Sequence, residues 1–147
     1  MEAKGLMRHG LTLFFAGLIT GFLVQLTPNP RAALAGHLEG VMNGTFLLAL
    51  GCAWSELRLS GAVARWVYRL VLFGAWANWA GTLLSGLLGT SKATPIAGAG
   101  HTGTLLQEYL VFAMLAAVGV TMVVSLGIVV WRQWRGPRIA EAAPIPK

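Results

Sequence analysis

The chain has 147 residues and a formal net charge of +6; 56% of its residues are hydrophobic, only 11% are charged, and aspartate is absent. So few ionisable groups exclude an ordinary soluble domain and indicate an integral membrane protein. The single cysteine, Cys52, excludes a disulfide framework and a cysteine-built metal site. The basic residues lie at the ends of apolar segments rather than on one face, so nucleic acid is not an expected partner.

Four apolar stretches are each long enough to cross a bilayer, which takes about 20 residues. They run over 10–26, 37–57, 63–88 and 105–131, and a loop rich in Gly, Thr, Ser and Pro covers 89–104. The first stretch ends at Thr27-Pro28-Asn29-Pro30, a strong helix stop. The predicted fold is therefore an all-α integral membrane protein. We expect a four-transmembrane-helix bundle over residues 1–136 and a short cytoplasmic tail over 137–147.

The basic residues predict the orientation of this bundle. Nine of them flank one side: Lys4, Arg8, Arg58, Arg65, Arg69, Arg132, Arg135, Arg138 and Lys147. Only Arg31 and Lys92 fall on the other side. By the positive-inside rule, both termini are predicted to be cytoplasmic.

The second stretch carries the densest group of polar residues, in the octapeptide that runs from His37 to Gly44. On a helix, Gly40 and Gly44 fall within roughly 60° of His37. An imidazole beside two residues without side chains leaves room for something flat. Glu39 and Asn43 lie four residues apart on the opposite face. Ionisable groups inside a membrane are functional candidates, so both faces of this helix are candidate sites.

The remaining polar groups on the outer side belong to the third and fourth stretches. They are Trp76, Asn78 and Thr82, and then His101, Gln107 and Glu108. Because all fall in the outer half of the predicted bundle, a single polar site there is the economical interpretation.

Pairs of small residues four positions apart occur on three stretches, at Gly17/Gly21, Gly40/Gly44 and Ala77/Gly81. Such pairs let helix backbones approach closely in lipid. They are explained either by packing within one protomer or by contact between protomers. A homo-oligomer with a shared site fits better than a monomer, because the second helix carries candidate groups on two faces.

Several strings resemble a known family. They are Asn29-Pro30-Arg31, the octapeptide His37–Gly44, Ala77-Asn78-Trp79-Ala80-Gly81-Thr82 and Gly100-His101-Thr102-Gly103 with Gln107-Glu108. Over residues 8–131 the sequence resembles the hydroxylaminobenzene mutases, small bacterial membrane enzymes of nitroaromatic degradation. The His37-to-Asn43 spacing and Trp76-Ala77-Asn78 are also similar to styrene oxide isomerase, which opens an aryl epoxide to an aldehyde.

The resemblance to the isomerase implies a cofactor and an assembly. There, the matching histidine ligates a b-type haem between the subunits of a trimer, and the matching asparagine lies at the substrate pocket. This implies haem b with its iron on His37, a homotrimer and a bacterial plasma-membrane location. The isomerase has a tyrosine at the position of Thr82 and an aspartate near Gly74. Their absence argues against epoxide isomerisation.

The predicted site follows from the residues and the resemblance together. The candidate cofactor-binding residues are His37, Gly40, Gly44, Trp76 and His101, and the candidate catalytic residues are Asn43, Asn78, Glu39 and Glu108. Simpler roles remain open for each. The histidines could bond loops, the asparagines could join helices, the tryptophans could form an interfacial belt, and the glutamates could sit at helix N-termini or pair with Arg31 and Lys92.

The expected reaction is the rearrangement of hydroxylaminobenzene to 2-aminophenol. It involves no net redox change, in keeping with a chain that lacks a Gly-rich dinucleotide fingerprint. The asparagines would orient the substrate, a glutamate would handle protons, and ferric haem would act as a Lewis acid. The alternatives are an epoxide-to-aldehyde isomerase and a small proton-coupled multidrug transporter. Such transporters carry their glutamate in the first span, where this chain has none.

Overall fold

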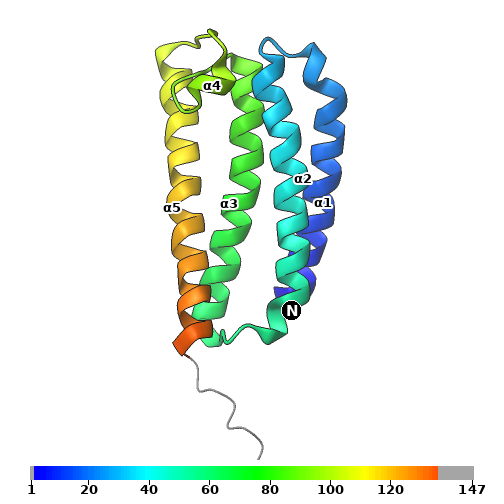
Figure 1. Cartoon of the computed structure of the whole chain (residues 1–147), viewed down its shortest axis with the longest axis vertical. Helices are drawn as coiled ribbons and strands as arrows, with labels where there is room; N and C mark the ends of the chain where they lie inside the picture. The colour runs from blue at the N-terminus through cyan, green and yellow to red at the C-terminus, as the bar shows by residue number, and fades with distance from the viewer. Residues whose placement is uncertain (1, 136–147) are drawn as a thin grey trace, which may run out of the picture.

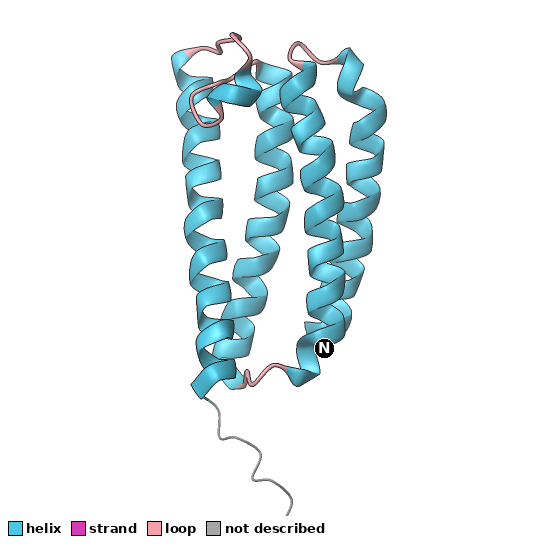
Figure 2. Ribbon diagram, viewed as in Figure 1, coloured by secondary structure: helices cyan, strands magenta, loops and turns pink. Residues whose placement is uncertain are grey.

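The computed structural model describes residues 2–135, which form four long helices and three short helical segments (Figure 1). The long helices are α1 (Glu2–Leu23), α2 (Pro30–Ala53), α3 (Gly61–Leu88) and α5 (Leu105–Arg135). The short segments are α4 (Pro95–Gly98) and the 3-10 turns η1 (Val24–Leu26) and η2 (Trp54–Glu56). The described residues contain no strand (Figure 2), which confirms the all-α prediction. Residues 137–147, the predicted tail, lie outside the described part.

The turn between α1 and α2 explains why α2 begins earlier than expected, at Pro30 rather than at His37. The Asn29 side-chain oxygen accepts hydrogen bonds from the backbone N–H groups of Arg31 and Ala32, both at 3.1 Å. Asparagine is a favoured N-cap, and proline suits the first position of a helix, where no backbone donor is needed. The same residues therefore end one helix and begin the next.

The predicted loop 89–104 holds a short helix that the sequence pattern did not indicate. α3 ends where Gly89 adopts a left-handed conformation (φ 65°), and α4 follows at Pro95. The Asn29 side-chain amide donates to the carbonyls of Ala97 and Gly98, both at 3.0 Å. The loop is therefore fastened over the beginning of α2.

The long helices pack mainly on their neighbours in the chain. α1 makes its most extensive contact with α2, α2 with α3, and α3 with α5, while α1 and α3 touch over a smaller area. Helix α5 lies at the edge of the row (Figure 1) and buries one stripe, which comprises Val111, Val118, Ser125 and Val129. Helix α5 therefore packs on α3 and makes little or no contact with α2.

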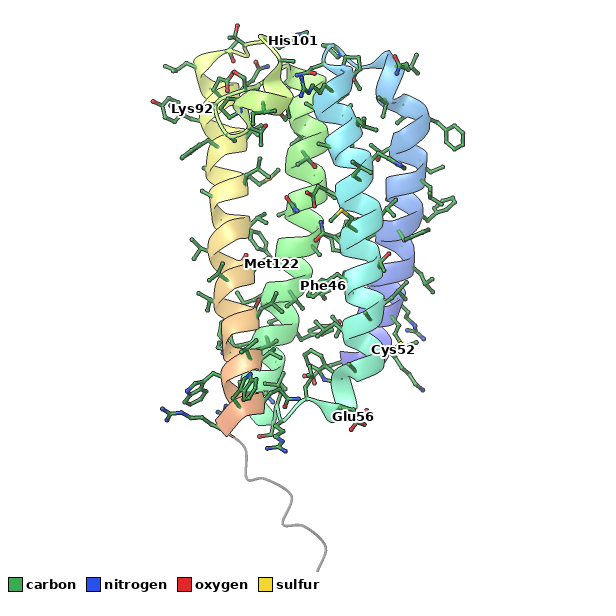
Figure 3. The ribbon with its side chains drawn as sticks, viewed as in Figure 1. Phe46, Cys52, Glu56, Lys92, His101 and Met122 are labelled. Atoms are coloured by element: carbon green, nitrogen blue, oxygen red, sulfur yellow. The ribbon has the colours of Figure 1, made fainter. Side chains whose placement is uncertain are left out.

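The two ends of the molecule carry different elements. The start of α1, the η2 turn and the end of α5 lie together at one end, and the α1–α2 turn and the α4 loop lie at the other (Figure 1). Glu56 and His101 mark these two ends in Figure 3. Seven of the nine basic residues that predict the cytoplasmic side fall in the described part, and their elements meet at the first end. The orientation across a membrane stays a prediction.

Within residues 2–135, three segments are long and apolar enough to cross a membrane: Glu2–Leu26, Gly61–Leu88 and Leu105–Arg135. This indicates a multi-pass membrane protein. The fourth predicted span corresponds to α2, which has 24 residues but is not among the three. Its histidine, glutamate and asparagine make it more polar than its neighbours, and these are the residues of the candidate site.

Candidate active site

His37 lies at the interface between α1 and α2, where it is half-buried. Its ring atom Nδ1 lies 2.8 Å from the carbonyl oxygen of Gly17 on α1. A carbonyl oxygen can only accept, so Nδ1 carries the proton and Nε2 keeps its lone pair. Nε2 makes no hydrogen bond within the described residues. The α1 contact thus uses Nδ1 and leaves Nε2 as the candidate ligating nitrogen.

Gly40 and Gly44 face α1 and bring the two helix backbones together. A Cβ atom at Gly40 would lie 2.5 Å from the Gly17 Cα, and one at Gly44 would lie 2.5 Å from the Phe14 nitrogen. Neither distance is sterically possible without moving a backbone. Within one chain, α1 therefore fills the space that the sequence pattern suggested for a flat cofactor beside these glycines. Here their spacing serves helix packing.

The other polar face of α2 meets α3 in a group that we call the amide–carboxylate cluster, made of Glu39, Asn43 and Asn78. The Glu39 Oε2 atom accepts from Asn43 Nδ2 at 3.0 Å and from Asn78 Nδ2 at 2.6 Å. Asn43 Nδ2 also donates to the backbone oxygen of Glu39 at 2.9 Å. Asn43 is 8% exposed, and the other two are half-buried. The structure thus brings three of the four predicted catalytic residues together.

Helix α3 supports this cluster through its backbone and its aromatic residues. The Thr82 hydroxyl donates to the backbone oxygens of Asn78 and Trp79 at 2.8 and 3.0 Å. Trp79 Nε1 donates to the Thr20 hydroxyl on α1 at 3.1 Å. These bonds fix the turn of α3 that carries Asn78 and link it to α1.

Trp76 precedes Asn78 on α3, and its ring lies edge-on to that of Trp79, with 5.7 Å between the ring centroids. Its Nε1 is the one buried side-chain polar atom without a hydrogen-bond partner in the described part of the chain. The ring of His9, which the sequence placed far from the site, lies 6.3 Å from that of Trp76. Sequence reasoning missed His9 and Thr20, because nothing in the spacing of α1 shows which of its faces meets α3.

Glu108 and His101 belong to the loop end rather than to the cluster. The Glu108 carboxylate accepts from the backbone nitrogens of Ser91, Lys92 and Gly103, with shortest distances of 3.1, 2.8 and 2.8 Å. It therefore holds the loop against the first turn of α5, as the helix-terminus alternative anticipated. His101 is exposed on the same loop (Figure 3), and its backbone N–H donates to Gly98.

An apolar groove of about 440 Å³ opens between the beginning of α2 and α4. Its lining includes Leu34, Ala35 and Leu38 on one side and Ile96 on the other. A smaller cavity of about 20 Å³ lies between Ala35 and Thr82. Ala35 precedes Glu39 by one helical turn, and Thr82 follows Asn78 by one turn. The smaller cavity thus lies at the α2–α3 contact, one turn from the amide–carboxylate cluster on each helix, and it shares Ala35 with the apolar groove.

The residues fit a haem better than a bare metal ion. Within residues 2–135, no group of three or more His, Cys or carboxylate side chains could hold a metal ion. A haem supplies four nitrogens itself and asks the protein for axial ligands only, of which a neutral imidazole is the commonest. A ligating histidine usually donates its other N–H to a carbonyl or carboxylate, as His37 does to Gly17.

Comparison with known proteins identifies the group to which the chain is related. The sequence matches the model of the family described as styrene oxide isomerase over residues 2–134. The chain belongs to the styrene oxide isomerase family.

Two known proteins resemble the chain over most of its length. Hydroxylaminobenzene mutase HabB of Ectopseudomonas oleovorans is 42% identical over 130 residues, which cover 88% of this chain and 79% of the relative. Hydroxylaminobenzene mutase HabA of the same organism is 38% identical over 126 residues, covering 82% and 93%. The resemblance noted in the sequence is thus confirmed, and the chain is an isomerase of this membrane family.

Proposed function

We propose that this protein is a mutase of the bacterial plasma membrane that rearranges hydroxylaminobenzene to 2-aminophenol. The amide–carboxylate cluster carries the proposal, because it places a carboxylate and two amides on one face of α2 and α3. The names of the two relatives support this choice of substrate.

The reaction moves a hydroxyl group from nitrogen to the ortho carbon of the ring, next to the carbon that bears the nitrogen. The ortho carbon loses its hydrogen as a proton, and the nitrogen gains one, so the atoms balance without a further reactant. A base beside the ring is needed for this transfer. Glu39 is suited to the task, because Oε2 holds the two amides while Oε1 makes no hydrogen bond in the described residues.

Asn43 and Asn78 would orient the hydroxylamino group, and the apolar groove beside α4 would admit the ring from the membrane's outer half. Leu34, Leu38 and Ile96 offer that groove an apolar lining. A site reached through apolar walls keeps bulk water from the N–O bond while it breaks. Trapped away from water, the hydroxyl group can return to the ring of the same molecule.

His37 would hold haem b through Nε2, with the Nδ1–Gly17 bond fixing the ring. When bound, the haem iron would supply a Lewis acid that polarises the N–O bond. His37 and Asn43 point roughly 120° apart on α2. A site that uses both is therefore best built between subunits, with His37 from one chain and the cluster from its neighbour. We propose a homotrimer for this reason and from the resemblance.

The alternative functions have less support from the contacts. The Thr82 hydroxyl stands where the isomerase has a tyrosine, but it donates to two backbone carbonyls. It is therefore not free to donate to an epoxide oxygen. A multidrug transporter of the kind considered above would carry its glutamate in the first span, whereas Glu39 lies on the second long helix, α2.

The test is a product assay with the purified protein in lipid nanodiscs. We expect 2-aminophenol from hydroxylaminobenzene, with no label incorporated when the reaction runs in ¹⁸O-water. Absence of 2-aminophenol, or oxygen taken from the solvent, would overturn the proposal. Styrene oxide, assayed in parallel for phenylacetaldehyde, separates the mutase from the isomerase alternative.

A further inference from the structure

The cluster reveals which polar groups the site can offer to a ligand. Asn43 Nδ2 has two hydrogens, and both are used: one on the Glu39 backbone oxygen and one on Glu39 Oε2. What remains of the Asn43 side chain is its carbonyl oxygen, which can only accept. Asn43 could therefore orient a ligand only by accepting a hydrogen bond from it.

The side-chain amide of Asn78 is oriented by the Glu39 carboxylate alone. Its Nδ2 has one hydrogen-bond partner, Glu39 Oε2 at 2.6 Å. Because Glu39 Oε2 accepts this hydrogen bond, the amide turns its NH₂ group toward Glu39 and its oxygen away. Asn78 keeps one free N–H beside that oxygen.

The free oxygens of the cluster are accessible. Neither asparagine oxygen nor Glu39 Oε1 accepts a hydrogen bond in the described part of the chain. Among the described residues, the only fully buried side-chain polar atom without a partner is Trp76 Nε1. The three free oxygens are therefore not fully buried within the chain. They form a surface with three acceptors and a single donor.

We infer that Glu39 is a specificity-determining residue, which turns the amides of Asn43 and Asn78 so that the site selects ligands bearing N–H or O–H donors. This rests on the proposed function and deepens it, because an N-arylhydroxylamine carries both donors and an aryl epoxide carries none. An acceptor left unpaired on binding is costly, so a site built to accept from a substrate rejects analogues that lack the donor. Glu39 thus separates the two chemistries by orienting its neighbours, besides any part it takes in proton transfer.

The test uses two isomers of one formula, benzyl alcohol and anisole, which match in size while only the alcohol has a donor. Their dissociation constants are measured by ligand-observed NMR on the protein in nanodiscs, with the mutase assay run in parallel. We expect the wild-type protein to bind benzyl alcohol at least about tenfold more tightly than anisole. Equal binding of the two isomers by the wild-type protein would overturn the inference without any variant.

The variant Glu39→Gln should lower that ratio toward one. A glutamine can donate as well as accept, so the Asn78 amide can flip and present its whole NH₂ group, rather than its oxygen and one N–H, to an ether oxygen, while Asn43 keeps its hydrogen bond to the backbone of residue 39. The matched control is Glu56→Gln, at the opposite end of the molecule, which should keep the wild-type ratio. A merely structural role for Glu39 would weaken both ligands equally, and an unchanged ratio in Glu39→Gln would refute the inference.

The binding ratio and the mutase assay fail independently. A wild-type protein that prefers the alcohol but makes no 2-aminophenol would remove the proposed function and leave the donor selectivity standing. A protein that makes 2-aminophenol without preferring the alcohol would support the proposed function and refute the donor selectivity.

Discussion

His37 uses its two ring nitrogens differently, and this difference defines its role. Nδ1 is committed to Gly17 on the neighbouring helix, so the ring cannot rotate without losing that bond. Nε2 has no hydrogen-bond partner among the described residues, so it is the candidate ligating nitrogen of the ring.

His37→Ala should abolish haem retention. Loss of a residue that only hydrogen-bonds to a metal ligand lowers metal affinity roughly 10–100-fold, and loss of the axial ligand itself should lower haem affinity further. Haem content of the purified protein, read from the Soret band, provides the measurement. His9→Ala serves as the control and should keep its haem, since His9 is exposed and contacts only the ring of Trp76 among the site residues. Full haem content in His37→Ala would remove this residue from the site.

At the scale of elements, the contact between α1 and α2 depends on the absence of side chains. A Cβ atom at Gly44 would meet the Phe14 backbone at 2.5 Å, whereas one at Gly119 on α5 would meet nothing within 4 Å. Gly44→Ala should therefore destabilise the protein by about 1–3 kcal/mol. Gly119→Ala, the same change on another helix, should be neutral or stabilise it by up to about 1 kcal/mol. Thermal unfolding in one detergent compares the two, and equal shifts would contradict the packing role.

The loop over α5 depends on one carboxylate. Glu108→Ala removes the acceptor for Ser91, Lys92 and Gly103, and bonds to a charged group contribute about 1.5–3 kcal/mol each. Hydrogen exchange at these three amides should therefore accelerate by at least about tenfold. Glu108→Gln keeps one acceptor oxygen, so its exchange rates should lie between those of the wild-type protein and Glu108→Ala. If Glu108→Ala lowers mutase activity as much as Glu39→Gln while exchange stays slow, Glu108 belongs to the catalytic machinery instead.

Sequence reasoning reached the elements more fully than the site. Apolar length and the Thr27–Pro30 stop predicted the four long helices, with α3 and α5 beginning within two residues of their observed starts. The spacing of Glu39 and Asn43 predicted a shared face, and the structure adds Asn78 to it. The partners of Gly40, Gly44 and Trp76 could not be predicted, because they depend on how α1 and α3 are rotated against α2. Apolar helices without a single hydrophobic face carry no signal for that rotation.

At the scale of the whole molecule, the charge distribution makes the orientation testable. The predicted cytoplasmic end carries the start of α1, the η2 turn and the end of α5. A fluorescent protein fused to the C-terminus should therefore fluoresce in bacteria, while alkaline phosphatase fused there should be inactive. The opposite result for both reporters would reverse the topology and place the amide–carboxylate cluster nearer the cytoplasm.

The shared-site model predicts complementation between two inactive variants. If His37 and Asn43 act across an interface, co-expressed His37→Ala and Asn43→Ala subunits should form mixed rings. In a closed ring of three with head-to-tail contacts, every mixed ring contains one junction with both intact residues. Doubly tagged complexes should therefore recover about a third of the wild-type activity per ring. Activity no higher than that of each variant alone would place both residues in a single chain's site.

The row of helices also has a consequence for how the protein is made. Each long helix packs mainly on the one synthesised just before it, so the order of emergence from the ribosome matches the order of packing. The α1–α2 pair, which has the most extensive contact, is complete before α3 exists. Such local contacts close early and at low entropic cost. No helix has to wait for a distant partner before it finds its main neighbour, and α5, with the least buried surface, arrives last.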